Sequence, residues 1–379
     1  MKIGIITFQR AQNFGAQMQM YALRTFLGNQ GHDVWILDYH CPNVEDRYLN
    51  VFRPIGKFLN KYYLPDFKLF VKSINAVLSG YHQQKVHAYN RFLSDFFKLT
   101  ERFENKEDLP IDFDVLITGS DQVWSYFETK GRKEPYFLDN GSNDGKAPIL
   151  ISYAASVEMK YYFLLLSDKD YVCTALKRFQ YVFTREQSLA NFISNDIGIP
   201  SKAVIDPSLL LNKDDYIKIA IKPKEEHYLL VYRVTPNKYI DDIAKLISEE
   251  LGLKIVYSHS SYIATDKTGM YGPREMLGFF CYADAIVTSS FHGTAFSIIN
   301  RKDFYCVYDK PQSRISDLLL ALQISSDRVL IGKDAYKGFT KVSYNEDAIN
   351  AFISKSVDLL VGTLNQVSTL KDNSDENNI

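Results

Sequence analysis

The feature that most constrains the fold is a repeated alternation of short apolar runs with longer amphipathic segments. The chain opens with KIGIITF at 2–8, continues with a helix-like segment at 15–30, and returns to an apolar run, DVWILDY, at 33–39. Further apolar runs follow at 114–120, 149–156, 181–185 and 202–208. Because these runs are nearly continuous rather than alternating, helices are expected to cover both faces of a parallel sheet. The sequence therefore predicts an α/β fold built from βαβ units.

The same pattern restarts after a charged stretch, NKDDYIKIAIKPKEEH, at 212–227. Such a restart predicts two Rossmann-like, doubly wound domains that face each other across a cleft. The predicted N-terminal domain spans 1–212, with a helical insertion near 51–102, and a linker at 213–227 leads to a C-terminal domain at 228–344. A terminal helix is expected at 345–364 and a disordered tail at 365–379.

Composition and charge exclude several classes of function. The chain has 379 residues, more than one hydrophobic core usually holds, and its net charge of −1 gives no field to attract nucleic acid. The four cysteines are widely separated and form no CxxC pair, which argues against structural zinc or a disulfide framework and favours a reducing cytoplasm. No metal or cofactor is expected. No run of about 18 apolar residues is present, so a membrane contact is expected only as a peripheral one, at the inner face of the membrane.

Ligands in open parallel sheets bind beyond the carboxyl ends of the strands, so the residues that follow each apolar run are site candidates. After the first run, Asn13 and Gly15 either contact a hydroxyl or anion, Asn13 then being an acceptor-binding residue, or simply form a helix cap and a tight turn. The strand expected in the run at 114–120 ends at Thr118, and the residues predicted on the acceptor side follow it, Ser120, Asp121, Gln122 and Trp124. Asp121 is interpreted as a base or a sugar ligand, and its alternative role is to cap the next helix.

Arginine and histidine supply the remaining candidates. Arg185 is the last residue of the run at 181–185, at the end of the expected strand, where a guanidinium can bind a carboxylate or phosphate bidentately, or else form a surface salt bridge to Glu186. In VTSSFHGTAFSIIN, at 287–300, Ser290 is a plausible N-cap, the free amides at 291–294 offer an anion site, and His292 stands in the first helical turn. Gly293 is interpreted as leaving room for a ligand. The donor-binding residues predicted besides Arg185 are Ser289, Ser290, Gly293, Thr294 and Arg314.

Five stretches, taken together, resemble the polysaccharide pyruvyltransferase family. They are NFGAQMQMYALRTFLGNQGHDVWILDY, DVLITGSDQVW, YAAS, TREQSLANFISNDIGIPSKAVIDPSLLL and VTSSFHGTAFSIINRKDF. The resemblance implies a GT-B-like architecture and transfer of an enolpyruvyl unit from phosphoenolpyruvate, as donor substrate, to a sugar, forming a pyruvate ketal. By motif position, His292 matches the family's cleft histidine and Arg185 its arginine after the strand. His292 and Asp121 are the predicted catalytic residues, and His292 is expected to contact the donor and pass a proton to its enol carbon or phosphate.

One position departs from the family pattern. Many members carry arginine two residues before the histidine, and here that residue is Ser290. Either another cation, such as Arg314 or Arg233, binds the donor, or the donor differs.

Three functions follow as alternatives. The resemblance implies a pyruvyltransferase that acts on a sugar or a lipid-linked oligosaccharide, in the synthesis of bacterial exopolysaccharide, capsule or cell wall. A GT-B glycosyltransferase that uses a nucleotide sugar is the second, although no EX7E-like signature supports it. A non-catalytic sugar-binding protein is the third.

Overall fold

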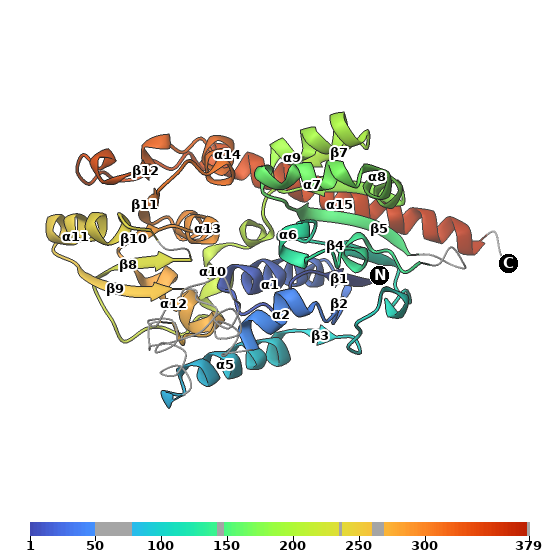
Figure 1. Cartoon of the computed structure of the whole chain (residues 1–379), viewed down its shortest axis with the longest axis horizontal. Coiled ribbons are helices and arrows are strands. Elements are labelled where there is room, and N and C mark those ends of the chain that lie inside the picture. The colour runs from blue at the N-terminus through green and yellow to red at the C-terminus, as the bar shows by residue number, and fades with distance from the viewer. Residues whose placement is uncertain (50–77, 142–147, 235–236, 260–268, 377–379) are drawn as a thin grey trace, which may run out of the picture.

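The protein contains two parallel β-sheets, each flanked by helices (Figure 1). This computed structural model describes residues 1–49, 78–141, 148–234, 237–259 and 269–376. The first sheet has seven strands in the order β3-β2-β1-β4-β5-β6-β7, and the second has five in the order β12-β11-β10-β8-β9. Adjacent strands in both sheets pair in parallel. The predicted α/β class with two doubly wound units is confirmed.

The first sheet forms from the apolar runs of the first half of the chain. Its strands are β1 (Lys2–Ile6), β2 (Asp33–Ile36), β3 (Lys98–Leu99), β4 (Val115–Thr118), β5 (Ile149–Ala155), β6 (Phe179–Thr184) and β7 (Ser201–Ala203). The helices around it are α1 (Phe14–Asn29), α2 (Pro42–Leu49), α5 (Tyr81–Phe96), α6 (Tyr126–Thr129), α7 (Tyr162–Ser167), α8 (Lys169–Leu176) and α9 (Gln187–Phe192). All four residues of β4 are buried, as a strand covered on both faces requires.

The second sheet repeats this construction. Its strands are β8 (Tyr228–Arg233), β9 (Lys254–His259), β10 (Ala285–Thr288), β11 (Asp303–Tyr308) and β12 (Val329–Ile331). The helices that follow in the chain are α10 (Lys213–Ile217), α11 (Ile240–Leu251), α12 (Pro273–Tyr282), α13 (Phe291–Ile299), α14 (Ser313–Ala321) and α15 (Glu346–Glu376).

An aromatic cluster joins the two halves of the chain. Phe14, the first residue of α1, is 1% exposed and stacks on Phe280 of α12, with ring centroids 5.2 Å apart. It also lies 4.9 Å from Phe296 of α13 and 6.1 Å from Tyr232 of β8. The hydrophobic core is therefore continuous between the two halves of the chain.

The segment predicted as a linker at 213–227 is partly structured and enters this core. It begins with α10, whose N-terminus is closed by a capping box between Asn212 and Asp215. Tyr216 is fully buried and donates a hydrogen bond to the carbonyl oxygen of Ser208, 2.7 Å away. The lysines and aspartates around Tyr216 made the stretch read as a linker, although one aromatic side chain on the inner face is enough to anchor a short helix.

The end of the chain differs from the prediction as well. The terminal helix, predicted at 345–364, runs from Glu346 to Glu376, so residues 365–376 are helical rather than disordered. Helical spacing of apolar residues continues past 364, and Leu360, Leu364 and Val367 are all buried. The helix returns to the first half, where the Ser356 hydroxyl accepts a hydrogen bond from the amide of Ile205 at 3.0 Å.

The predicted helical insertion near 51–102 lies partly outside the described residues. Its described part contains α5, whose residues Phe92 and Leu93 are buried in the core. Among the ranges that the structure describes, no helix is long and apolar enough to cross a membrane.

Candidate functional site

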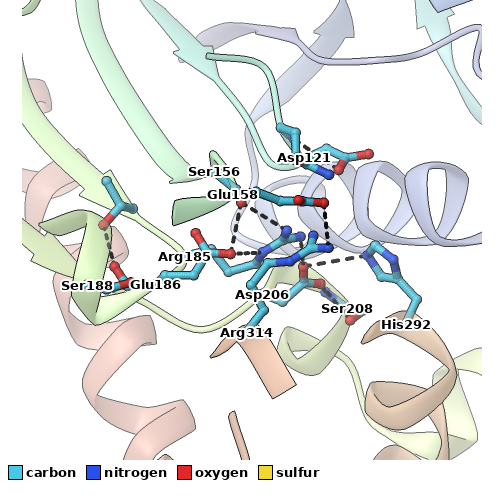
Figure 2. A network of polar contacts seen from close by, with 12 residues as sticks. Asp121, Ser156, Glu158, Arg185, Glu186, Ser188, Asp206, Ser208, His292 and Arg314 are labelled. Atoms are coloured by element: carbon cyan, nitrogen blue, oxygen red, sulfur yellow. Dashed lines mark hydrogen bonds and ion pairs between the residues drawn. The ribbon is translucent and has the colours of Figure 1, made fainter. Parts of the chain in front are cut away.

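A network of charged and polar side chains lies where the two halves meet (Figure 2). Arg185 and Asp206 follow strands of the first sheet, and His292 follows β10 of the second. Figure 2 shows Arg185 surrounded by Ser156, Glu186 and Asp206, with His292 beyond Asp206. Residues far apart in the sequence therefore come together at the carboxyl ends of strands from both sheets.

Arg185 is a buried cation with three partners. Its side chain is 3% exposed, and Nη1 lies 3.0 Å from Asp206 Oδ2 while Nε lies 3.0 Å from Glu186 Oε1. Nη2 donates to the hydroxyl of Ser156 at 3.1 Å. Burial acts against its charge, but the carboxylates of Glu186, Asp206 and Asp121 outweigh burial and raise the pKa of Arg185. The surface salt bridge considered for Arg185 is instead a buried one.

Asp206 is the central acid of the network, and sequence reasoning did not select it. It caps the short 3-10 helix Pro207–Leu210, and its Oδ1 accepts from the amide and the hydroxyl of Ser208 at 3.0 and 2.6 Å. Burial alone would raise the pKa of Asp206, but the interactions with His292, Arg185 and Ser208 lower it well below the ordinary value. Asp206 lies three residues beyond the end of β7 but inside the apolar run predicted at 202–208, so it was not counted among the residues that follow a run.

His292 stands in the first turn of α13, as predicted. Ser290 caps this helix by accepting from the amide of Gly293 at 3.3 Å. The imidazole is 12% exposed, and its Nε2 lies 3.6 Å from Asp206 Oδ2. This distance allows an ion pair when His292 is protonated, although it exceeds a normal hydrogen bond.

Gly15 makes room for this imidazole. A Cβ atom on Gly15 would lie 2.0 Å from Nδ1 of His292 and 2.2 Å from its Cγ, far inside van der Waals contact. The tight-turn interpretation therefore misses the reason for glycine here, which is that the histidine of the second half packs against the start of α1. Asn13 has the capping role: its side chain accepts from the amide of Ala16 at 3.2 Å.

Asp121 adds a further negative charge at the edge of the network. Its φ of 77° lies in the left-handed region, its Oδ1 accepts from the amide of Gln122 at 2.9 Å, and its carbonyl accepts from the amide of Ser156 at 2.9 Å. The hydroxyl of Ser125, rather than Asp121, caps the next helix, α6. The capping alternative for Asp121 is therefore not what the structure contains.

Arg314 reaches the network from α14. Its Nη2 lies 3.4 Å from Glu158 Oε1, and its side chain is 21% exposed, so it is the more accessible of the two site arginines. Glu158 follows β5, and sequence reasoning did not select it. Arg233, the other cation considered for the donor, pairs instead with Asp241 at 3.0 Å.

Three residues that were predicted to contact the substrates pack against other parts of the protein instead, so these predictions are corrected. Trp124 is 1% exposed, stacks on Phe137 at 5.3 Å and donates from Nε1 to the carbonyl oxygen of Tyr136 at 3.1 Å, so it does not face a sugar. Thr294 is fully buried and donates to the carbonyl oxygen of Ser290 at 3.0 Å. At Gly293, a Cβ atom would lie 2.1 Å from Oγ1 of Thr288, so glycine is needed for close packing of α13 against β10 rather than for ligand access.

Several buried polar atoms near these residues have no hydrogen-bond partner within the described part of the chain. They are Ser120 Oγ, Gln122 Oε1, Glu186 Oε2, Ser289 Oγ and His292 Nε2. Folded proteins rarely leave buried polar atoms unpaired, so such atoms mark places where water or a ligand binds. Ser120, Gln122 and Ser289 were predicted as substrate contacts from their positions after strands alone. No group of three His, Cys, Asp or Glu side chains in the described ranges is arranged to hold a metal ion.

Comparisons with known proteins place this geometry in context. Similar solved structures include a UDP-GlcNAc 2-epimerase from Neisseria meningitidis, with 12% identity, a TM-score of 0.45, and coverage of 95% of this chain and 91% of that chain. An alpha-glucosyltransferase in complex with UDP has 10% identity, a TM-score of 0.43, and coverage of 81% and 80%. At these scores, nothing about activity follows. No curated protein matches. Residues 13–311 match the family model described as "Polysaccharide pyruvyl transferase".

Proposed function

The chain belongs to the polysaccharide pyruvyl transferase family, and from this premise we propose that it transfers the enolpyruvyl unit of phosphoenolpyruvate to a sugar, forming a cyclic pyruvate ketal. The observation that carries the proposal is the pairing of His292 with Asp206. An imidazole whose Nε2 makes no normal hydrogen bond in the described ranges, and lies 3.6 Å from a buried carboxylate, suits a residue that gives and takes a proton.

The reaction needs one proton donor and one oriented acceptor. His292 gives a proton to the methylene carbon C3 of phosphoenolpyruvate, which makes C2 electrophilic. One sugar hydroxyl adds to C2 and a second displaces phosphate, so two C–O bonds form and the π bond and the C2–O(phosphate) bond break. The two hydroxyls together lose two protons: one restores His292 and the other leaves with phosphate. Orientation of the sugar supplies much of the remaining rate enhancement.

Charges in the site suggest how the two substrates divide it. Arg185 is neutralised by Glu186 and Asp206, so in this proposal it holds Asp206 in position for His292 rather than binding the donor. Donor phosphate is assigned to the start of α13, where the amides of Phe291 and His292 precede the capped one, and to Ser289. Arg314 is assigned as the cation that binds the donor, because its side chain is the more exposed of the two site arginines.

The acceptor is assigned to the loop after β4. Asp121 and the unpartnered atoms of Ser120 and Gln122 offer acceptors and a donor for sugar hydroxyls. The substrate class is a sugar with two hydroxyls placed for ketal formation, in a precursor of bacterial exopolysaccharide, capsule or cell wall.

Transfer in D2O tests the proposal directly. Purified protein, phosphoenolpyruvate and a panel of sugars and lipid-linked sugars are followed by 31P and 1H NMR. We expect release of phosphate and a ketal methyl group that carries one deuterium, because the proton on C3 comes from solvent through His292. Glycosyl transfer from a nucleotide sugar would replace the proposal with a glycosyltransferase. Sugar binding without turnover of either donor would replace it with a non-catalytic role.

A further inference from the structure

One side of the protein exposes large apolar side chains at helical spacing. Met159, Phe163 and Leu166 are 50%, 63% and 48% exposed, and their spacing of four and three residues places them along one side of α7 and the turn before it. Phe127 of α6 is 48% exposed, and its ring stacks on that of Tyr161 with centroids 4.8 Å apart. We refer to Phe127, Met159, Tyr161, Phe163 and Leu166 as the apolar patch. The helical spacing and the ring contact group these side chains together, unlike singly scattered surface apolar residues.

Two lysines lie within this patch. The ammonium of Lys130 is 4.8 Å from the centroid of the Phe127 ring, and that of Lys160 is 4.8 Å from the centroid of the Tyr161 ring. Both side chains are exposed. Lys130 forms no ion pair with any residue in the described ranges, so its charge is available to a partner.

The patch adjoins the candidate site. Lys160 pairs with Glu158 at 2.6 Å, and Glu158 lies 3.4 Å from Arg314. One carboxylate thus connects a lysine of the patch with an arginine of the site, and Met159 is the residue that follows it.

We propose that the apolar patch docks on the surface of an anionic lipid bilayer. Aromatic and aliphatic side chains beside a lysine are a combination that binds at the boundary between headgroups and acyl chains, where Lys130, whose charge is not paired within the described ranges, attracts anionic lipids. Lysine is depleted in the centres of protein interfaces, which argues against a second protein as the occupant.

Docking of this kind gives the site its acceptor. Docking through the patch holds the neighbouring Glu158–Arg314 pair of the site close to the bilayer surface. A sugar carried on a membrane lipid then reaches the site without leaving its lipid anchor. This consequence rests on the proposed function, whereas the docking itself does not.

Vesicle co-sedimentation tests the docking with the full chain. The probes are vesicles of phosphatidylcholine alone and of phosphatidylcholine with about one-third phosphatidylglycerol. We expect binding to the anionic vesicles, and a partition coefficient at least tenfold lower for Phe163→Ser combined with Leu166→Ser. Lys130→Gln is expected to lower binding about fivefold at low salt, and less at high salt.

Ile331→Ser, at a position 45% exposed on β12 of the other half, is the matched control and should bind like the wild type. Equal binding by the double variant and the wild type, or no binding by the wild type to anionic vesicles, overturns the proposal. A dimer that the double variant dissociates, seen by analytical ultracentrifugation, identifies a second copy as the occupant and also overturns it. Turnover of phosphoenolpyruvate with a water-soluble sugar is measured separately, so failure of docking and failure of the proposed reaction are distinguishable.

Discussion

At the scale of single residues, the chemistry depends on His292. General acid–base participation is worth about 10²–10⁴ in rate, so His292→Gln should lose that much turnover while the fold is kept. Single-turnover transfer from phosphoenolpyruvate, with a melting curve for each protein, measures both effects. His227→Gln is the control, because the side chain of His227 is 88% exposed. Wild-type turnover by His292→Gln would remove the catalytic role.

Gly15 permits a sharper test of how the histidine is positioned. In Gly15→Ala the new methyl group would lie 2.0 Å from His292 Nδ1, so the imidazole must move. We expect turnover to fall at least tenfold, with a loss of about 1–3 kcal/mol in the free energy of unfolding.

Gly28→Ala, in the same helix, is the matched control. Nothing lies within 4 Å of the site of its Cβ, and alanine favours the helix, so activity should not change. If Gly15→Ala is as active as Gly28→Ala, contact with Gly15 does not hold the imidazole in place.

The buried charge of Asp206 predicts a pH dependence of stability. Its pKa is lowered on folding, so the stability it contributes is fully present above the unfolded value of about 3.9 and is lost as the pH falls below it. Asp206→Asn should lower the free energy of unfolding at pH 7 by about 3–5 kcal/mol, because Arg185 loses a buried partner.

Denaturant titrations at pH 7 and pH 3 measure this effect. The difference between wild type and Asp206→Asn should shrink at pH 3, where Asp206 is mostly protonated in the unfolded chain but not in the folded one. Asp112→Asn, at a side chain 100% exposed, should leave both values nearly unchanged. A difference that is the same at both pH values would mean that the charge of Asp206 is not what stabilises the fold.

At the scale of secondary-structure elements, the sequence predicts strands well and side-chain destinations poorly. Strands such as β4 and β10 are found where their apolar runs predicted them, because strands buried on both faces need continuous apolar residues. A residue after a strand can face either a ligand or the core, and periodicity does not distinguish the two. The sequence therefore did not show that Trp124 packs into the core whereas Asp121 lies at the polar network.

The missed elements have a related cause. Asp206 follows a three-residue strand, too short for a pattern to mark its end, and DPS reads as an ordinary turn. The close packing of the His292 ring against Gly15 joins residues from opposite halves of the chain, and no local sequence pattern encodes such a contact. The charged composition after 364 likewise conceals the few apolar residues, such as Val367, that keep α15 helical and packed.

The terminal helix gives a prediction at this scale. Leu360 is fully buried in the core, so Leu360→Ala should lower the free energy of unfolding by about 2–5 kcal/mol. Leu320→Ala, at a position 79% exposed in α14, should change it by less than about 0.5 kcal/mol. Denaturant titration monitored by tryptophan fluorescence measures both. Equal small effects would mean that α15 does not stabilise the first half.

At the scale of the whole molecule, the shared aromatic cluster around Phe14 should make the two halves unfold together. A large apolar contact between halves opposes independent motion and independent unfolding. Both tryptophans, Trp35 and Trp124, lie in the first half, whereas Cys281 and Cys306 are buried in the second.

Tryptophan fluorescence and thiol labelling, read by mass spectrometry at Cys281 and Cys306, therefore report on different halves. Their denaturation midpoints should coincide. With Phe14→Ala, the two midpoints are expected either to separate or to shift together to lower denaturant concentration, with a loss of about 3–5 kcal/mol in the free energy of unfolding. Separate midpoints already in the wild type would show that the cluster does not couple the halves.

The return of α15 to the first half also matters while the chain is being made. The last strand of the seven-stranded sheet, β7, leaves the ribosome long before α15 is synthesised. At about 5–20 residues per second, roughly ten to thirty seconds pass between them. During this time the surface that later receives Leu360 and Leu364 is open to other nascent chains. Adding a C-terminal extension to the chain should let α15 leave the exit tunnel while the chain is still tethered to the ribosome, so that this surface is covered before release.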